Sequence, residues 1–223
     1  MEIEIANDAR ELGIFIYACE VLNVEVKKDK LIEEELKKAE AMFVNTNLED
    51  LKNDPVVRSY REFYWRIGID PTKTRPSGEA LRRRVARGNP IPRINNIVDA
   101  GNIASLITLV SIGIYDLDKI KGSLKLTLSK GGETFIPIGS DKSVILNKGF
   151  PILIDDEGKI LHLYPHKDSE LTKITENTRN ILIISAGIPF LDKSLVKKAL
   201  EITAKLISFS CSSAFIKEIK EIR

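Results

Sequence analysis

The segment LHLYPHKDS at residues 161–169 holds both histidines of the chain and could support chemistry. Alternation along a strand puts His162 and Tyr164 on one face. Pro165 then ends regular strand pairing and places His166 in a turn. A His-xxx-His pair can chelate a metal on a helix, which Pro165 forbids, and on an extended strand the two rings would lie about 13 Å apart. We therefore expect no metal site here, and we expect His162 to be incidental.

His166 and Asp168 form a better candidate pair, because they lead into the polar segment SELTKITENT. A neutral His166 could orient a water molecule for attack, with Asp168 holding the imidazole ring. In the alternative interpretation, Asp168 caps the turn at Ser169–Thr172 and His166 lies on the surface. The residues alone leave both interpretations open.

The stretch from Lys73 to Arg93 is strongly basic, with seven basic side chains and a single acid, Glu79, in a chain of formal net charge +2. On the helix predicted there, Arg83 and Arg87 share an outer face and repel each other by a few tenths of a kcal/mol. A phosphate would offset this cost, and guanidinium groups recognise phosphate well. The alternative is a solvated helix face on which Arg84 pairs with a buried carboxylate. An RNA-binding surface here would consist of Arg75, Arg82, Arg83 and Arg87.

Composition narrows the class of protein. With 43% hydrophobic and 30% charged residues, the chain is typical of a folded soluble domain. No apolar run approaches the roughly 18 residues of a membrane span, and the acidic N-terminus is unlike a signal peptide. We therefore expect a cytoplasmic protein whose two cysteines, Cys19 and Cys211, are buried thiols; a disulfide between them is the alternative. The absence of Gln, with many Ile, Lys and Glu, is typical of a thermophile.

The sequence also lacks the motifs of the common enzyme classes. It contains no GxSxG, HExxH, P-loop or GxGxxG pattern. We therefore expect neither a cofactor nor a metal.

Helical patterns dominate the first half of the chain and strand patterns the second. Apolar periodicity predicts a helix from Asp29 with the stripe Leu31, Leu36, Ala39, Met42 and Phe43. Further helices are predicted at 54–67, from Ser77 as N-cap to Gly88, at 96–110 and at 192–207. Strands are predicted at 2–5, 13–26, several times between 122 and 188, and near the C-terminus. Without regular βαβ alternation, this order predicts an α+β fold and a single domain over 1–223.

Three blocks of the sequence resemble a known family. They are GIDPTKTRPSGEALRRR (68–84), the VDxxN formed by Val98, Asp99 and Asn102, and YDLDKIKG (115–122). In this order, and with SELTKITENTRNILI (169–183), they resemble the B3/B4 domain. This is the tRNA-editing module in the beta subunit of bacterial phenylalanyl-tRNA synthetase, and it also occurs as free-standing proteins. The resemblance covers about residues 58–210.

The resemblance implies a fold for the chain. In the synthetase, the domain is an α+β unit with a β-sandwich of unusual topology and flanking helices. Residues 1–57 would then be an N-terminal strand–helix extension packed on this core.

The family's tyrosine-recognising residues are absent from this chain. In the synthetase, a Thr precedes the Asn of VDxxN, a His lies eleven residues beyond that Asn, and a Glu closes a later strand. Here these positions hold Gly101, Gly113 and Ile184. The resemblance therefore implies a roomier or differently shaped pocket that does not select tyrosine. Asn102 and Thr178 are further candidate pocket residues, each with a purely structural alternative.

The resemblance also implies a function. The synthetase domain hydrolyses the ester of tyrosine wrongly attached to the phenylalanine tRNA, and free-standing relatives are candidates for editing in trans. We therefore expect tRNA as partner and a hydrolase with His166 and Asp168 at its centre, unless Asp168 binds the substrate's free α-amino group. A non-catalytic RNA-binding module and a small amino-acid-binding or assembly domain remain alternatives. The sequence leaves open which tRNA is used and whether the chain forms a homo-oligomer.

Overall fold

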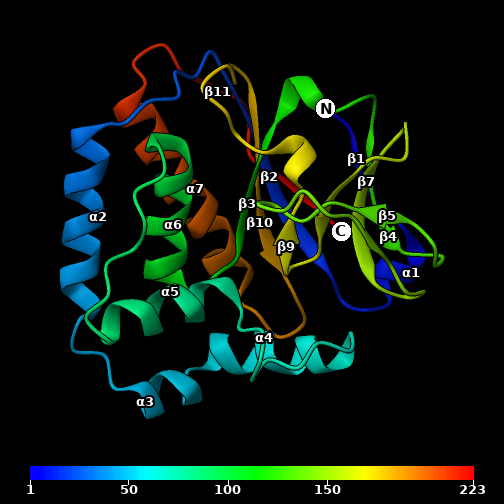
Figure 1. The fold of residues 1–223 in the computed structure, drawn as a ribbon, viewed down its shortest axis with the longest axis horizontal. Coiled ribbons are helices and arrows are strands. Elements are labelled where there is room, and N and C mark those ends of the chain that lie inside the picture. The colour runs from blue at the N-terminus through cyan, green and yellow to red at the C-terminus, as the bar shows by residue number, and fades with distance from the viewer.

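Two β-sheets and a layer of helices are stacked in three layers in the computed structural model, which describes residues 1–223 (Figure 1). The first sheet has the order β1 (Ile3–Ile5), β4 (Leu124–Leu128), β7 (Pro151–Asp155), β8 (Ile160–Leu163) and β9 (Lys167–Asp168). The second has the order β11 (Phe215–Ile216), β2 (Phe15–Leu22), β10 (Ile181–Gly187) and β3 (Ile112–Asp116), with β12 (Lys220–Ile222) also paired to β2. The expected α+β fold with a β-sandwich and flanking helices is confirmed.

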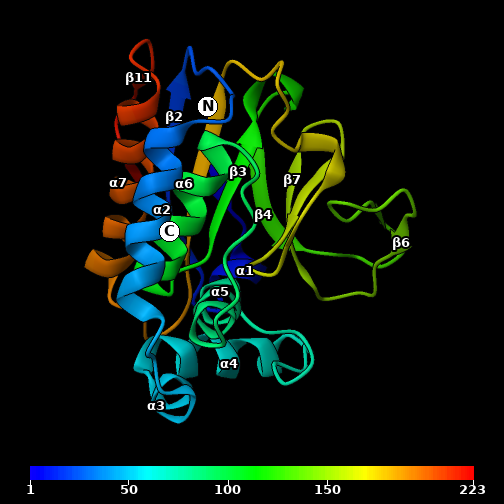
Figure 2. The ribbon, with the colours of Figure 1, turned by 60° about the vertical axis from the view of Figure 1, so that its left-hand side comes forward.

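The helices form two groups. Figures 1 and 2 show α6 (Asn96–Thr108) and α7 (Lys193–Ser210) over the outer face of the second sheet, with α2 (Lys30–Phe43) packed on α6 farther from the sheet. At one end of the molecule lie α3 (Leu48–Asn53), α4 (Pro55–Arg66) and α5 (Ser77–Ala86). The remaining short elements are α1 (Asn7–Arg10), β5 (Thr134–Phe135), β6 (Val144–Ile145) and the 3-10 turns η1 (Leu117–Lys119) and η2 (Glu170–Thr172).

Side-chain caps fix where the main helices begin. Asp29, Asp54, Asn95 and Asp192 each accept hydrogen bonds from backbone N–H groups in the first turn of the helix that follows. Ser77 differs from the prediction, because Pro76 is the residue before α5 and the Ser77 hydroxyl donates to Ser111 instead.

The buried stripe of α2 also differs from the prediction. Ile32, Leu36 and Ala39 are buried, as the helical spacing of a core-facing stripe requires. Leu31 and Met42 are 48% and 66% exposed. The prediction was wrong for these two residues because the true stripe begins one position later, at Ile32.

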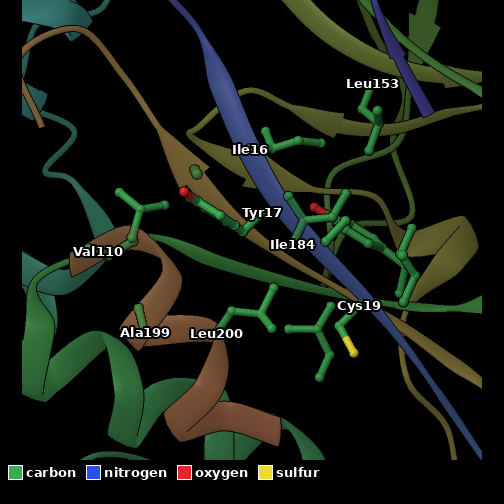
Figure 3. Packing of buried hydrophobic residues seen from close by; sticks show 14 of the residues in the cluster. Ile16, Tyr17, Cys19, Val110, Leu153, Ile184, Ala199 and Leu200 are labelled. Carbon is green, nitrogen blue, oxygen red and sulfur yellow. The ribbon is translucent and has the colours of Figure 1, made fainter. Parts of the chain in front are cut away.

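The main core lies between the two sheets and between the second sheet and α7. Strands β2 and β10 are buried on both faces, which explains their nearly continuous apolar sequences. Figure 3 shows Leu153 of the first sheet on one side of β2, with Ala199 and Leu200 of α7 on the other. Both cysteines are buried free thiols, as expected.

Residues 1–57 are more closely integrated than an extension packed on a finished core. Strand β2 pairs with β10 over seven residue positions, from Phe15 opposite Gly187 to Val21 opposite Ile181. It also pairs with β11 and β12 on its other side. The N-terminal segment therefore supplies an interior strand of the second sheet.

Candidate functional site

A cavity of about 440 Å³ opens where the free edge of β3 meets α6 and the segment from β9 to η2. Its size falls in the range typical of small-molecule sites. Its lining mixes aliphatic and polar side chains, and the segment Asp168–Lys173 forms a polar wall. The aliphatic side chains are Ile94, Val98, Ile112, Ile114, Ile138 and Ile174. The polar side chains are Asn102, Asp168, Ser169, Glu170, Thr172 and Lys173.

The VDxxN residues build the helical wall. Asp99 is buried and accepts a hydrogen bond of 3.0 Å from the Ile94 backbone N–H, so it fixes the loop that enters α6. Asn102 follows one turn later, lines the cavity and makes no hydrogen bond with its side chain. Gly101 lets the helix approach β3, because a Cβ there would lie 3.0 Å from the Ile114 side chain. This motif therefore places a free amide at the cavity.

Asp168 pairs with His162, which corrects the expectation for both histidines. The two residues face each other across the β8–β9 ladder, and His162 Nδ1 lies 2.8 Å from Asp168 Oδ1. His162 is buried between the edges of Tyr115 and Tyr164, with ring centroids 6.0 and 5.8 Å away. Asp168 keeps about a third of its side chain exposed. His162, expected to be incidental, thus holds the carboxylate of the polar wall.

His166 lies outside the lining of the cavity. Its ring packs edge-on against Tyr64, with centroids 6.1 Å apart. Burial, followed by the charges of Lys167 and His162, lowers the pKa of His166 to about 4. A ring in this position neither reaches Asp168 nor orients a water in the cavity, so the structure does not bring the predicted pair together.

The polar wall contains one hydroxyl without a partner. Thr172 is completely buried, and its Oγ1 is the single buried side-chain polar atom of the chain that makes no hydrogen bond. Its neighbours are satisfied: Ser169 Oγ accepts from the Leu171 N–H, and Glu170 pairs with Lys173. Ser169, and not Asp168, therefore caps η2. A buried hydroxyl left unpaired costs about 1–3 kcal/mol.

Gly113 and Ile184 sit away from the cavity lining, opposite each other in the β10–β3 ladder. A Cβ at Gly113 would collide with the Tyr115 hydroxyl, so the tyrosine ring fills the space that the glycine leaves. Burial, and then the charge of Asp168, raise the pKa of Tyr115 well above its usual value. The roomier pocket expected at Gly113 is therefore wrong, because Tyr115 occupies that volume.

Thr178 is also outside the lining and braces a loop. Its hydroxyl donates to Asp116 Oδ2 at 2.8 Å and accepts from the Thr175 N–H at 3.0 Å. Both hydrogen-bonding functions of the hydroxyl are therefore used inside the protein. Of the predicted pocket residues, the cavity brings together Gly101, Asn102 and Asp168.

The arginines of α5 mostly bond within the protein. Glu79, fully buried, accepts hydrogen bonds from Arg61 and Arg83, and Arg75 Nε lies 3.9 Å away. Burial alone would raise the pKa of Glu79, but the bonds from Arg61 and Arg83 outweigh it and lower the pKa. The predicted buried carboxylate is thus present as Glu79, but it pairs with Arg83 and not with Arg84.

Arg82 is equally committed to the fold. It donates to the carbonyls of Leu106 and Ile107 at the end of α6 and lies 4.0 Å above the Phe43 ring. Of the four arginines expected at RNA, only Arg75 and Arg87 are exposed. Arg87 makes no hydrogen bond or ion pair with its side chain, so it and Arg75 are the two that remain accessible to a phosphate.

A larger cavity, of about 550 Å³, lies between the N-terminal segment and the C-terminal strands. Glu20 binds both the Met1 amino group and Lys217, whereas Glu2, Glu218 and Lys220 make no ion pair. Burial raises the pKa of Cys19 at this cavity to about 11, which keeps the thiol protonated. No group of three or more His, Cys, Asp or Glu side chains lies together, and no helix is apolar and long enough to span a membrane.

Comparison with known protein families identifies the family of this chain. Residues 59–212 match the model of the B3/4 domain. The chain belongs to the B3/4 domain family. Two archaeal relatives are phenylalanine–tRNA ligase beta subunits: that of Methanocaldococcus jannaschii is 37% identical over 112 residues, and that of Methanosphaera stadtmanae 34% identical over 119. These matches cover 42% and 44% of this chain but only about a fifth of the relatives, at 20% and 21%.

A solved structure shows the same fold over almost the whole B3/4 chain. It is an N-terminal fragment of the phenylalanyl-tRNA synthetase beta subunit from Pyrococcus horikoshii, with a TM-score of 0.56 and 17% sequence identity. The match covers 99% of this chain and 53% of the fragment. It therefore includes the N-terminal strands that lie outside the B3/4 family model.

Proposed function

We propose that this B3/4 chain binds tRNA and hydrolyses the ester of a wrongly attached amino acid in trans. The observation that carries the proposal is the cavity at β3, which the free Asn102 amide and the partly exposed Asp168 carboxylate line together with aliphatic side chains. The relatives named above are subunits of an enzyme that acts on tRNA. An aminoacyl group has the polar head and carbon side chain that a cavity of mixed lining can hold.

The reaction needs little from the protein. Water attacks the ester carbonyl, the tetrahedral oxyanion collapses, and the amino acid leaves the 3′-terminal ribose. Asn102 Nδ2–H is a donor that could stabilise the oxyanion, and such a donor contributes about 10²–10³ in rate. Fixing the ester beside a water molecule supplies further acceleration. We expect an amino acid other than tyrosine, because Ile184 stands at the position of the family's tyrosine-recognising Glu.

The test is the deacylation of a panel of aminoacyl-tRNAs by the intact chain. We expect release of at least one amino acid, no release of tyrosine from the phenylalanine tRNA, and a loss of about 10²-fold in Asn102→Ala. Asn177→Ala changes an exposed asparagine outside the cavity and serves as the matched control. If no member of the panel were hydrolysed, the proposal would be wrong.

A non-catalytic RNA-binding module is the second candidate. It is favoured by the position of His166, which leaves the cavity without an imidazole in its lining. Such a module would bind tRNA through Arg75 and Arg87 with a marked salt dependence and would release no amino acid. The panel above separates the two candidates.

A further inference from the structure

The cavity at β3 contains two carboxylates with different electrostatic surroundings. Glu170 is neutralised by an ion pair with Lys173, and it also accepts a 2.9 Å hydrogen bond from the Gly139 N–H. Asp168 has no lysine or arginine partner; its side chain bonds to His162 through Oδ1 and also interacts with the hydroxyl of Tyr115, whose pKa it raises. The Asp168 side chain is about one-third exposed and lines the cavity, so a ligand can reach it.

Neighbouring residues fix the position of Asp168. Its carbonyl accepts a 2.9 Å hydrogen bond from the Ile138 N–H, which ties β9 to the segment that connects β5 and β6. Its side chain is held by His162, and the His162 ring cannot swing away because Tyr115 and Tyr164 flank it. Tyr164 is itself anchored, since its hydroxyl bonds to the Phe15 and Gly187 carbonyls. A carboxylate held in this way loses little freedom when it binds a ligand.

We infer that Asp168 binds the free α-ammonium group of the aminoacyl ester, and that His162 positions it for this role. The inference rests on the proposed function, because it assumes an aminoacyl ligand in the cavity at β3. It names the substrate class as esters of α-amino acids whose amine is unblocked. N-formylated or N-acylated aminoacyl-tRNA, and peptidyl-tRNA, would be excluded.

The physical basis is the desolvation of Asp168 by the bound ligand. An ammonium group replaces the lost water with charge-assisted hydrogen bonds to the carboxylate. An acylated amine carries no charge and adds bulk, so it leaves the carboxylate desolvated and unpaired. Sites built for one hydrogen-bonding group reject analogues that lack it by several orders of magnitude when the group is fully buried. Because Asp168 is partly exposed, we expect a smaller preference, of about 10–100-fold.

The test measures binding, so that it does not depend on turnover. The probes are 3′-alanylamino-3′-deoxyadenosine, which has a stable amide in place of the ester, and its N-acetyl derivative. Calorimetry on the intact wild-type chain should show about 10–100-fold tighter binding of the free-amine probe. Asp168→Asn should remove this preference, because it weakens binding of the free-amine probe and relieves the desolvation penalty on the N-acetyl probe.

The variants at His162 test positioning separately. His162→Leu should reduce the preference, whereas His162→Asn should restore part of it, because the Asn amide can donate from near the place of Nδ1. Glu176→Gln changes an exposed carboxylate eight residues further on, outside the cavity, and should leave the preference intact. If His162→Leu and His162→Asn showed the same preference for the free-amine probe, the positioning role would be wrong.

Three results would overturn the inference: equal affinity of the wild type for the two probes, no binding of either at millimolar concentration, or an unchanged preference in Asp168→Asn. If Asp168→Asn abolished hydrolysis of free and N-acetylated aminoacyl-tRNA alike, Asp168 would act in the chemical step and the inference would again be wrong. Selective binding of the free-amine probe without hydrolysis of any aminoacyl-tRNA would support the inference and contradict the proposed hydrolase.

Discussion

The arginine-rich helix α5 and the cavity at β3 use their side chains in opposite ways. In α5, Arg82 donates to the Leu106 and Ile107 carbonyls of α6, and buried Glu79 bonds to Arg61 of α4 as well as to Arg83, so the helix is anchored to α4 and α6. At the cavity, the Asn102 amide leaves its hydrogen-bonding groups unused. A dense cluster of charge can thus be structural, while an uncharged group without partners points more directly to a ligand.

The largest effect that separates the two regions is expected at Glu79. Glu79→Gln leaves the Arg61 and Arg83 guanidinium groups without their shared carboxylate, so we expect a loss of about 3 kcal/mol or more in the free energy of unfolding. Urea unfolding measures this, with Glu176→Gln as the exposed control. A loss below about 1 kcal/mol would contradict the structural role of α5.

Glu79 also makes stability depend on pH. Its pKa is lowered in the folded state, so its contribution is fully present above the carboxyl's ordinary pKa and disappears as the pH falls through the lower folded value. Wild type should therefore lose stability on acidification more steeply than Glu79→Gln, and the two unfolding curves should converge at low pH.

Thr172 should behave in the opposite manner. Thr172→Val removes a hydroxyl that has no partner, so we expect stability to be unchanged or raised. Thr178→Val is the matched control, because it removes a buried hydroxyl that bonds to Asp116 and should lower stability without changing the activity of the folded protein. Reduced stability in Thr172→Val would show that its hydroxyl is satisfied after all.

A pair of arginines divides α5 itself into structural and accessible parts. Arg82→Ala should lower stability by about 1–3 kcal/mol, because it leaves carbonyls at the end of α6 without their donor. Arg87→Ala should leave stability unchanged, weaken tRNA binding and reduce the slope of log affinity against log salt by about 1. Filter binding at several salt concentrations measures the slope. Equal slopes for wild type and Arg87→Ala would remove Arg87 from the RNA surface.

His166 should give the smallest effect at neutral pH. Because burial lowers its pKa to about 4, the ring stays neutral above that value, and His166→Gln should leave the pH profile of deacylation unchanged near pH 7. The sign of the stability effect follows from linkage: the unfolded state binds the proton more readily, so wild type loses stability as the pH falls from about 6.5 towards 4. In His166→Gln this part of the pH dependence should be flatter.

The sequence predicted the fold and the VDxxN wall better than the polar wall. Apolar periodicity and caps are local signals, so α4, α6 and α7 were predicted close to their observed bounds. The pairing of Asp168 with His162 depends on which residues of neighbouring strands lie opposite each other, and residue spacing along one strand does not reveal this. The predicted turn at Pro165 did contain the information, because a hairpin centred on Pro165 places residue 162 opposite residue 168.

Two other errors had physical causes that the sequence does not contain. Gly113 suggested empty space, but the neighbouring Tyr115 folds its hydroxyl into it. Arg82 and Arg83 suggested an exposed phosphate surface, but their direction depends on how α5 packs against α4 and α6. In each case the nature of the residue was informative, and its neighbours across the fold determined its role.

The central place of β2 has a consequence for how the domain can be cut. The family model begins at residue 59, yet β10 depends on a strand from residues 15–22 for one of its two hydrogen-bonded edges. A protein consisting of residues 59–212 would expose that apolar edge to other chains, which favours edge-to-edge aggregation. The smallest unit able to fold alone is therefore larger than the region that defines the family in sequence.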